Sequence, residues 1–427
     1  MVFKMKITAL DCLRCGAGFR DFCFVKISTD GTTPEGKPIV GWSEYLEERN
    51  IGVTQVIEWM GQLVVGEDPL PWAKIVAQLK CNTRHIVGGI ANQAIAAIEN
   101  AILDVVGKAY GVPCAALFGG PIRTELEVYY SHCGSFRVGF NEMLQSPHTG
   151  EMTPPLRSLD DVRALGAEVK ASGYKALKTN IFLFDAAGGP GSMYMPGFGG
   201  GSGSPQLNIH QPLIKTIVTQ MRTFREAVGD DIGLKLDLNY NFKTDGFIQI
   251  AKALTPEALG SSVGIDWLEL DTYSPQALRQ IRDAAPMPIA SLESLMGRRA
   301  ILPFLEAGAV DVCIIDPLWN GVDESIKMAE LCDVYEVNCA AHNYHGWLGT
   351  AICAHFCAAI PNFKVLETDV DDVPWKDEIV TVVPSIVDSI FTLPTGPGWG
   401  VDIDEEALKR HPPMHDAKSG IWSAANP

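Results

Sequence analysis

Short apolar runs alternate with longer amphipathic stretches along the chain beyond residue 122. Eight of these runs predict buried strands: Leu126–Tyr130, Ala176–Thr179, Ile232–Leu238, Ile265–Leu270, Pro288–Leu292, Val310–Ile315, Tyr335–Ala341 and Phe363–Leu366. More than about 15 residues separate each run from the next, which is enough for a helix that connects parallel strands. Eight successive strand–helix units predict a closed parallel barrel.

The first 122 residues follow a different pattern. Lys4–Leu10 and Phe22–Ser28 alternate between apolar and polar positions, as strands do, and Gly41–Glu44 is predicted to continue their sheet. Cys12–Arg20 is predicted as a loop between the first two strands, because it is rich in Gly and Cys. Apolar residues recur at helical spacing across Ile90–Tyr110, and a Gly-Val-Pro sequence ends that helix.

These patterns predict an α/β protein in three segments. An α+β capping domain (1–122) precedes a modified (β/α)8 TIM-type barrel (123–392), and a tail (393–427) returns to the capping domain. A glycine-rich insertion (186–204) follows the second barrel strand. It lacks the Gly-Lys-Ser/Thr ending of a phosphate-binding loop, so we expect no nucleotide there. A mobile lid over the barrel mouth and a disordered surface insertion are both open interpretations.

Composition narrows the range of partners. The chain has 427 residues, of which 51 are acidic and 34 basic, and its formal net charge is -17. That balance repels nucleic acid and anionic lipid, so neither is an expected partner, and an anionic substrate needs locally placed cations or a metal. No apolar run approaches the roughly 20 residues of a membrane span, and the first residues lack a signal-peptide pattern. The odd count of 11 cysteines is typical of reduced thiols, and we expect a cytoplasmic protein.

Ionisable residues stand at the ends of the predicted strands from the second to the eighth. In order they are Lys178, Asp237, Glu269, Glu293, Asp316, His342 and Glu367. The carboxyl ends of parallel barrel strands meet at one mouth, where catalytic groups lie. Neighbouring carboxylates raise each other's pKa unless a cation compensates, and an all-oxygen ligand set favours Mg²⁺ over zinc. The alternative, pairing with basic side chains, has only Lys178 and Lys235 as nearby candidates.

Sequence motifs around these residues make the pattern specific. They are Leu117-Phe118-Gly119-Gly120, Lys178-Thr179-Asn180, Leu236-Asp237-Leu238-Asn239, Trp267-Leu268-Glu269, Ser291-Leu292-Glu293-Ser294, Ile315-Asp316-Pro317, Ala341-His342-Asn343 and Val365-Leu366-Glu367. Together they resemble the enolase superfamily, and within it the mandelate racemase subgroup of acid-sugar dehydratases and racemases. The resemblance covers almost the whole chain.

The resemblance implies an Mg²⁺-dependent enzyme that removes the proton α to a carboxylate. Asp237, Glu269 and Glu293 would hold the metal, which stabilises the resulting enediolate. His342 would be the acid/base, with Asp316 raising its basicity and fixing its tautomer.

Other ionisable residues have supporting or alternative roles. By the resemblance, Lys178 would stabilise the substrate carboxylate, and Glu367 would donate a hydrogen bond to a developing oxyanion if it is protonated. His345 is the weaker candidate for the base, because it does not directly follow the strand. His355 is expected to pack inside a helix, and His132, at the end of the first strand, is not placed in the site.

Four further side chains are expected to bind substrate: Asn180, Asn239, Arg20 and Tyr45. Asn180 stands where the related racemases have a second lysine base, so racemisation loses support. Asn239 stands where the galactonate dehydratases have a histidine, so galactonate is not assigned as the substrate. The resemblance places Arg20 and Tyr45 in loops that cover the barrel mouth, with Arg20 as a cation for a distal group of the substrate.

Two departures from the family pattern alter the metal strands. Leu270 follows Glu269 where the family has a second Glu, and Leu292 precedes Glu293 where it has Gly. A lower metal affinity and compensation by Asp271 are both open.

The predicted reaction is dehydration of a sugar acid, an aldonate or an aldarate, to a 2-keto-3-deoxy acid. A racemase, epimerase or cycloisomerase that uses the same enediolate is the first alternative. A catalytically degenerate barrel with a binding role is the second. The expected partner is a small carboxylate, and members of this family commonly form homo-oligomers.

Overall fold

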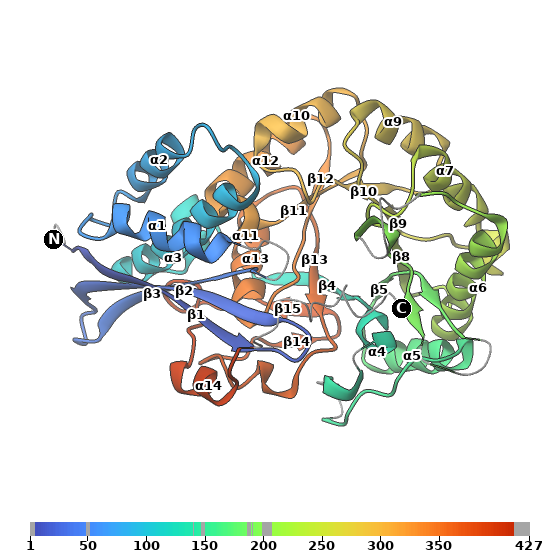
Figure 1. Ribbon diagram of the computed structural model, residues 1–427, viewed down its shortest axis with the longest axis horizontal. Helices are drawn as coiled ribbons and strands as arrows, with labels where there is room; N and C mark the ends of the chain where they lie inside the picture. Colours follow the sequence, from blue (N-terminus) through green and yellow to red (C-terminus); the bar gives the residue numbers. More distant parts are fainter. Residues whose placement is uncertain are drawn as a thin grey trace.

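The computed structural model describes residues 5–47, 52–139, 141–146, 150–185, 189, 191–198 and 207–413. Figure 1 shows the blue capping sheet on the left and the barrel strands inside a ring of helices on the right. The capping sheet is antiparallel, with strands β1 (Ile7–Gly16), β2 (Asp21–Thr32) and β3 (Pro38–Tyr45) in that order. Its helices are α1 (Val53–Val64), α2 (Trp72–Asn82) and α3 (Gly89–Tyr110).

The predicted loop between the first two strands is wrong over most of its length. Strand β1 continues to Gly16, and Cys12 and Cys15 pair with Val25 and Phe22 of β2. The turn is therefore confined to the few residues between Gly16 and Asp21. Glycine and cysteine suggested a loop, but the partner strand satisfies the backbone hydrogen bonds there, and pairing outweighs local composition.

All eight predicted barrel strands are present. They are β4 (Glu125–Ser131), β5 (Ala176–Thr179), β8 (Gly233–Asp237), β9 (Trp267–Glu269), β10 (Ile289–Ser291), β11 (Val312–Ile315), β12 (Asn338–Ala341) and β13 (Phe363–Asp369). Neighbouring strands are parallel, and β13 pairs with β4, which closes the barrel. The predicted α/β barrel with an α+β capping domain is confirmed.

Helices surround the barrel (Figure 1). The longer ones are α5 (Leu159–Ala171), α6 (Gln211–Val228), α7 (Thr244–Ala253), α9 (Pro275–Ala284), α10 (Arg298–Glu306), α12 (Val322–Val334) and α13 (Trp347–Ala359). Short helices are α4 (Ser135–Gly139), α8 (Pro256–Leu259), α11 (Pro317–Asn320) and α14 (Glu405–Arg410). Strand β15 (Ile390–Thr392) pairs antiparallel with β4, and β14 (Ile386–Val387) pairs antiparallel with β15.

A layer of apolar side chains fills the barrel interior. It comprises Tyr129, Ala176, Trp267, Ala290, Val312, Ile314, Ala340 and Val365, all on barrel strands. Side chains two residues apart on a strand point the same way, so the residues two positions beyond this layer point toward the mouth. Lys235, on β8, joins the interior: its Nζ lies 4.7 Å from the Trp267 ring centroid and pairs with Asp266 at 2.8 Å.

The C-terminal segment packs on the capping domain. The backbone N–H of Trp399 donates to Asp104 at 2.9 Å, and its Nε1 donates to the carbonyl of Trp42 at 3.1 Å. The N–H of Gly16 donates to the carbonyl of His411 at 2.9 Å. Residues 414–427 of the predicted tail lie outside the described residues.

The glycine-rich insertion is described in part. Strand β7 (Ser192–Met193) pairs with β6 (Phe182–Leu183), and the N–H of Gly197 donates to Asn241 at 3.0 Å. The described part therefore packs on the loop that follows β8, while residues 186–188, 190 and 199–204 lie outside the description. No helix in the described ranges is long and apolar enough to cross a membrane.

Candidate active site

The ends of β11 and β12 bring His342 and Asp316 together. His342 Nδ1 lies 2.7 Å from Asp316 Oδ2. Asp316 also caps α11, because its Oδ1 accepts a hydrogen bond from the N–H of Leu318 at 2.7 Å. With Nδ1 held by the carboxylate, Nε2 is the ring nitrogen left to exchange a proton, and it lies 3.9 Å from Glu293 Oε2.

Charges around this pair set its protonation. Burial lowers the pKa of His342, but the negative charges of Glu293 and Asp316 outweigh burial and raise it to about 10. Burial raises the pKa of Asp316, but hydrogen bonds from His342 and His345 lower it to about 2. With Glu293 ionised, the pair is an imidazolium against a carboxylate at neutral pH. A cation that neutralised Glu293 would remove the largest cause of the rise and let the neutral imidazole accept a proton at Nε2.

Lys178 lies between two carboxylates. Its Nζ is 2.6 Å from Glu269 Oε1 and 2.7 Å from Glu367 Oε1. Burial raises the pKa of Glu367, but Lys178 and His342 hold it well below its ordinary value. The condition for the predicted oxyanion contact, a protonated Glu367, is thus not met in this arrangement. Lys178, one of the two basic partners that the sequence offered, is therefore the one that pairs with these acids.

Asp237 and Glu269 end β8 and β9, and Glu293 lies two residues beyond the end of β10. Burial raises the pKa of Glu269 to about 8, with Asp237 adding to the rise and Lys178 opposing it. Burial also raises the pKa of Glu293 well above its ordinary value, and the neighbouring acids add to that rise. A divalent cation would stabilise the ionised form of these carboxylates, and carboxylate oxygens are the ligands that Mg²⁺ prefers, so the donor set fits Mg²⁺.

The same carboxylates are not gathered around one point in the structure. Among the residues that the structure describes, no three His, Cys, Asp or Glu side chains are grouped as metal ligands would be. The reason is visible at Glu269, whose oxygens are bonded to Lys178 and to Trp267 Nε1, the latter at 3.0 Å. Binding a cation between the three strands would require Glu269 to exchange these partners.

A left-handed turn brings Glu293 to the mouth. Along β10 the interior side chain is Ala290, so Leu292 and not Glu293 is in phase with it. Leu292 adopts φ 88, a conformation rare for a residue with a side chain, and this turn redirects the chain so that Glu293 approaches His342. The glycine expected at this position by family resemblance suits the same conformation.

Asp271 stabilises that turn. Its Oδ1 accepts hydrogen bonds from Ser291 Oγ at 3.1 Å and from the N–H of Leu292 at 3.2 Å. Because this carboxylate is engaged by β10, its observed role is to hold the turn rather than to replace a missing ligand.

The two asparagines predicted to bind substrate are bonded within the protein. Asn180 accepts a hydrogen bond from Ser135 Oγ at 2.7 Å and donates to the carbonyl of Asp237 at 3.2 Å. Asn239 donates from Nδ2 to Asp237 Oδ2 at 2.9 Å, while its Oδ1 is buried and has no hydrogen-bond partner among the described residues. Asn180 thus braces β5 against β8, and Asn239 orients Asp237.

Arg20 and Tyr45, which the sequence analysis expected to bind substrate, are both bonded to other residues of the protein. Arg20 is buried and pairs with Asp369 at 3.3 Å and Asp372 at 2.7 Å, which joins the capping domain to the end of β13. Tyr45 lies in the core of the capping domain, and its hydroxyl is 2.9 Å from Thr54 Oγ1. We therefore exclude Tyr45 from the site and describe Arg20 as a link between the domains.

The two other histidines noted in the sequence are buried. His345 lies behind the dyad, with Nε2 3.5 Å from Asp316 Oδ2 and Nδ1 4.0 Å from Glu44 Oε1. His355 packs in α13, where it accepts from the N–H of Ala115 at 3.2 Å and its Nε2 lies 3.1 Å from the carbonyl of Trp399. Packing was the expectation for His355.

His132, which the sequence analysis left out of the site, lies at the same end of the barrel as the predicted site residues. It follows β4, and its Nδ1 lies 2.7 Å from Asp369 Oδ1. The available signal was its position at the end of the first strand, which matches the positions of the other ionisable residues on their strands.

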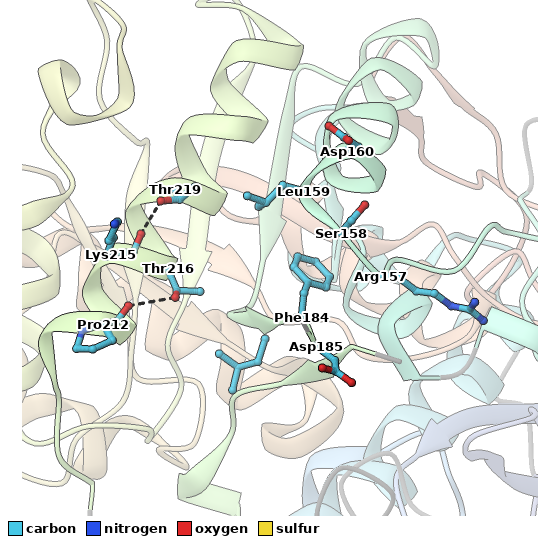
Figure 2. A pocket seen from close by; sticks show the side chains of 11 residues that line it. Arg157, Ser158, Leu159, Asp160, Phe184, Asp185, Pro212, Lys215, Thr216 and Thr219 are labelled. Carbon is cyan, nitrogen blue, oxygen red and sulfur yellow. Dashed lines mark hydrogen bonds between the residues drawn. The ribbon is translucent and has the colours of Figure 1, made fainter. Parts of the chain in front are cut away.

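A surface hollow of about 660 Å³ lies outside the barrel, between α5 and α6. Figure 2 shows Arg157 and Lys215 on opposite sides of it, with Phe184 between them. No residue of the predicted active site lines this hollow.

The closed parallel barrel under an antiparallel capping domain, with ionisable residues at one mouth, defines a capped barrel protein. A family model described as "Enolase C-terminal domain-like" matches residues 161–407. A second, the "Mandelate racemase / muconate lactonizing enzyme, N-terminal domain", matches residues 18–119. The chain therefore belongs to the enolase superfamily, in its mandelate racemase/muconate lactonizing enzyme family.

Relatives within this family differ in reaction. The chain is 30% identical over 369 residues to D-xylonate dehydratase of Haloferax volcanii, covering 84% of this chain and 80% of the relative. It is 27% identical to D-galactarolactone cycloisomerase of Agrobacterium fabrum over 382 residues, 86% of this chain and 87% of the relative.

A solved structure from Burkholderia xenovorans gives a higher identity. It is of a protein named as a candidate L-alanine-DL-glutamate epimerase, with 38% identity and a TM-score of 0.88, covering 98% of this chain and 100% of that chain. Another structure of that protein is bound to magnesium and fumarate. The chain is thus an enolase-superfamily enzyme whose relatives include dehydratases and isomerases.

Proposed function

We propose that this enzyme is an Mg²⁺-dependent dehydratase that converts a sugar acid, an aldonate or an aldarate, to a 2-keto-3-deoxy acid. The observation that carries the proposal is the His342–Asp316 pair, whose free Nε2 faces the carboxylate strands at the mouth. The identity to a D-xylonate dehydratase supports the substrate class.

His342, Asp316 and Lys178 have different roles in the proposed reaction. His342 Nε2 takes the proton from C2 of the substrate, and Asp316 holds Nδ1 and keeps the ring oriented. Lys178 places a positive charge beside Glu367 and Glu269, where it can bind the substrate carboxylate. Elimination of the 3-hydroxyl then gives an enol, which tautomerises to the ketone.

Asp237, Glu269 and Glu293 are the proposed ligands of Mg²⁺. When bound, the cation would neutralise the substrate carboxylate and the negative charge that develops as the C2 proton leaves. The raised pKa of Glu269 and Glu293 supports a cation here, because burial and neighbouring acids both disfavour the ionised carboxylates.

An epimerase is the second candidate, and the 38% identity to a candidate epimerase favours it. Epimerisation needs an acid/base on each face of the substrate. Asn180 cannot take a proton, and Lys178 is held as a cation by two carboxylates. These two residues favour dehydration over transfer of a proton between faces.

Proton NMR in D₂O tests the two candidates. The protein is incubated with Mg²⁺ and a panel of aldonic and aldaric acids, with a chelator as the control. A 3-deoxy product that disappears with the chelator is the expected result for the dehydratase. Deuterium at C2 without elimination would support the isomerase instead, and no reaction with any acid would contradict both.

A further inference from the structure

A second histidine–aspartate pair lies at the barrel mouth. His132 follows β4, and its Nδ1 lies 2.7 Å from Oδ1 of Asp369, the last residue of β13. The same distance joins His342 Nδ1 to Asp316 Oδ2. Because β13 lies between β12 and β4, the two imidazoles flank the strand that carries Glu367.

The His132 ring is held in one orientation. It stacks on Phe136 with 4.9 Å between centroids, and it meets the Tyr344 ring edge-on at 5.4 Å. Tyr344 belongs to the segment between His342 and α13, so this contact packs His132 against the segment that follows His342. Nδ1 faces the carboxylate, and Nε2 forms no hydrogen bond within the described residues.

His132 is also accessible and close to the proposed reacting groups. Its side chain is 11% exposed, against 10% for His342. Ser131, the preceding residue, donates from Oγ to Glu367, and Lys178 pairs with the same carboxylate.

We propose that His132, oriented by Asp369, is a second catalytic residue that donates a proton from Nε2 to the leaving 3-hydroxyl. This inference rests on the proposed dehydration. Hydroxide is a poor leaving group, so its departure as water needs an acid beside the breaking bond. His342 has just received the C2 proton, and a separate acid frees it from serving both positions.

His342 Nε2 takes the C2 proton, and the electron pair of that C–H bond forms the C2–C3 double bond. The C3–O bond breaks as His132 Nε2 gives its proton to the oxygen, which leaves as water. The enol then moves one proton from its oxygen to C3, and exchange with solvent returns both imidazoles to their starting forms.

Three variants and two kinds of substrate test the assignment. His132→Asn removes the imidazole and suits φ 44 at this position, because Asn tolerates left-handed backbone. His342→Asn serves as the comparison, and exposed His85→Asn is the matched control. The probes are D-xylonate, D-gluconate and D-galactonate with Mg²⁺, together with their 3-deoxy-3-fluoro analogues, because fluoride leaves without a proton.

The expected result separates proton removal from elimination. His132→Asn should lose dehydration about a hundredfold or more while C2 deuterium exchange stays within about threefold of the unmodified protein. The fluoro analogue should restore elimination in His132→Asn, measured as fluoride release, and should not restore it in His342→Asn.

Other outcomes overturn the inference. Unchanged dehydration in His132→Asn would mean that His342 acts as both base and acid. Loss of exchange and of fluoride release together, with an unchanged unfolding temperature, would make His132 a structural or binding residue. If the unmodified protein neither exchanges nor eliminates with any probe, the proposed function fails and the inference falls with it.

Discussion

The two sides of the barrel mouth differ in how their charges are balanced. On the side of β11, β12 and β13, carboxylates have protein partners: Asp316 has His342, and Glu367 has Lys178. On the side of β8, β9 and β10, burial and neighbouring acids raise the pKa of Glu269 and Glu293, although Glu269 shares Lys178 with Glu367. One side is electrostatically complete within the protein, and the other becomes complete when a cation binds.

This difference separates two requirements of the proposed chemistry. Proton transfer needs side chains that keep their position and tautomer through each turnover, and paired charges provide that rigidity. Metal binding needs carboxylates that are free to exchange partners. Glu269 illustrates the second case, because it is bonded to Lys178 and Trp267 and has to move to reach a cation.

The largest effect is expected from the paired side. His342→Asn should lower kcat about a thousandfold, because general acid–base catalysis typically contributes 10² to 10⁴. Mg²⁺ affinity should change little, since His342 is not a proposed ligand. Steady-state kinetics and a calorimetric metal titration would measure both, with His85→Asn as the control. Retained turnover would remove His342 as the base.

Glu293→Gln should show the opposite division of effects. Loss of one carboxylate ligand should weaken Mg²⁺ binding about a hundredfold or more, since even outer-shell changes cost 10- to 100-fold. Removal of a buried acid with a raised pKa should leave the fold intact. Calorimetry with Mg²⁺, using exposed Glu330→Gln as the control, measures the change. An unchanged affinity would exclude Glu293 from the ligand set.

Mg²⁺ alone should stabilise the unmodified protein. At a concentration 100 times its Kd, binding to the folded state adds about 2.7 kcal/mol to the free energy of unfolding. Thermal unfolding with and without chelator measures this gain, and Glu293→Gln should lose most of it. Equal stabilisation by Mg²⁺ in both proteins would place the cation away from the carboxylate side.

His355 shows what burial does without carboxylates, and it gives the smallest expected effect. Burial lowers its pKa to about 4, although a hydrogen bond to the Trp399 carbonyl opposes the change. Below about pH 6.5 the unfolded chain binds a proton that the native state excludes. The free energy of unfolding should therefore decrease as the pH is lowered, by about 2 kcal/mol between pH 6.5 and 5.

The slope can be assigned to this residue with one variant. His355→Gln keeps a donor and an acceptor but does not titrate, so denaturant unfolding should show a shallower pH dependence between pH 6.5 and 5. Between pH 7 and 8 the two proteins should have parallel curves, because His355 is neutral in both states. Identical slopes below pH 6.5 would show that His355 gains its proton in the folded protein.

Local patterns predicted the barrel well. Each strand was visible as a short apolar run, and parallel order brought Asp316 and His342 to neighbouring strand ends. The alternation of side chains along the strands also explains why Lys178 and Glu367, two residues beyond interior positions, meet at the mouth.

Contacts between distant segments were beyond reach of such patterns. Arg20 pairs with Asp369 and Asp372, more than 300 positions away, and no periodicity in the first domain indicates this. Tyr45 and Asn180 are occupied by neighbours that only the folded chain supplies. Glu293 needed the left-handed turn at Leu292, which a leucine does not suggest.

The link through Arg20 has a consequence for biosynthesis. Domains of a growing chain generally fold from the N-terminus as they leave the ribosome. The capping domain is made first, but Asp369, Asp372 and Trp399, which complete its contacts, are among the last parts described. Buried Arg20 and Asp104 therefore lack their final partners for most of translation, so the capping domain acquires these contacts only when the barrel is nearly finished.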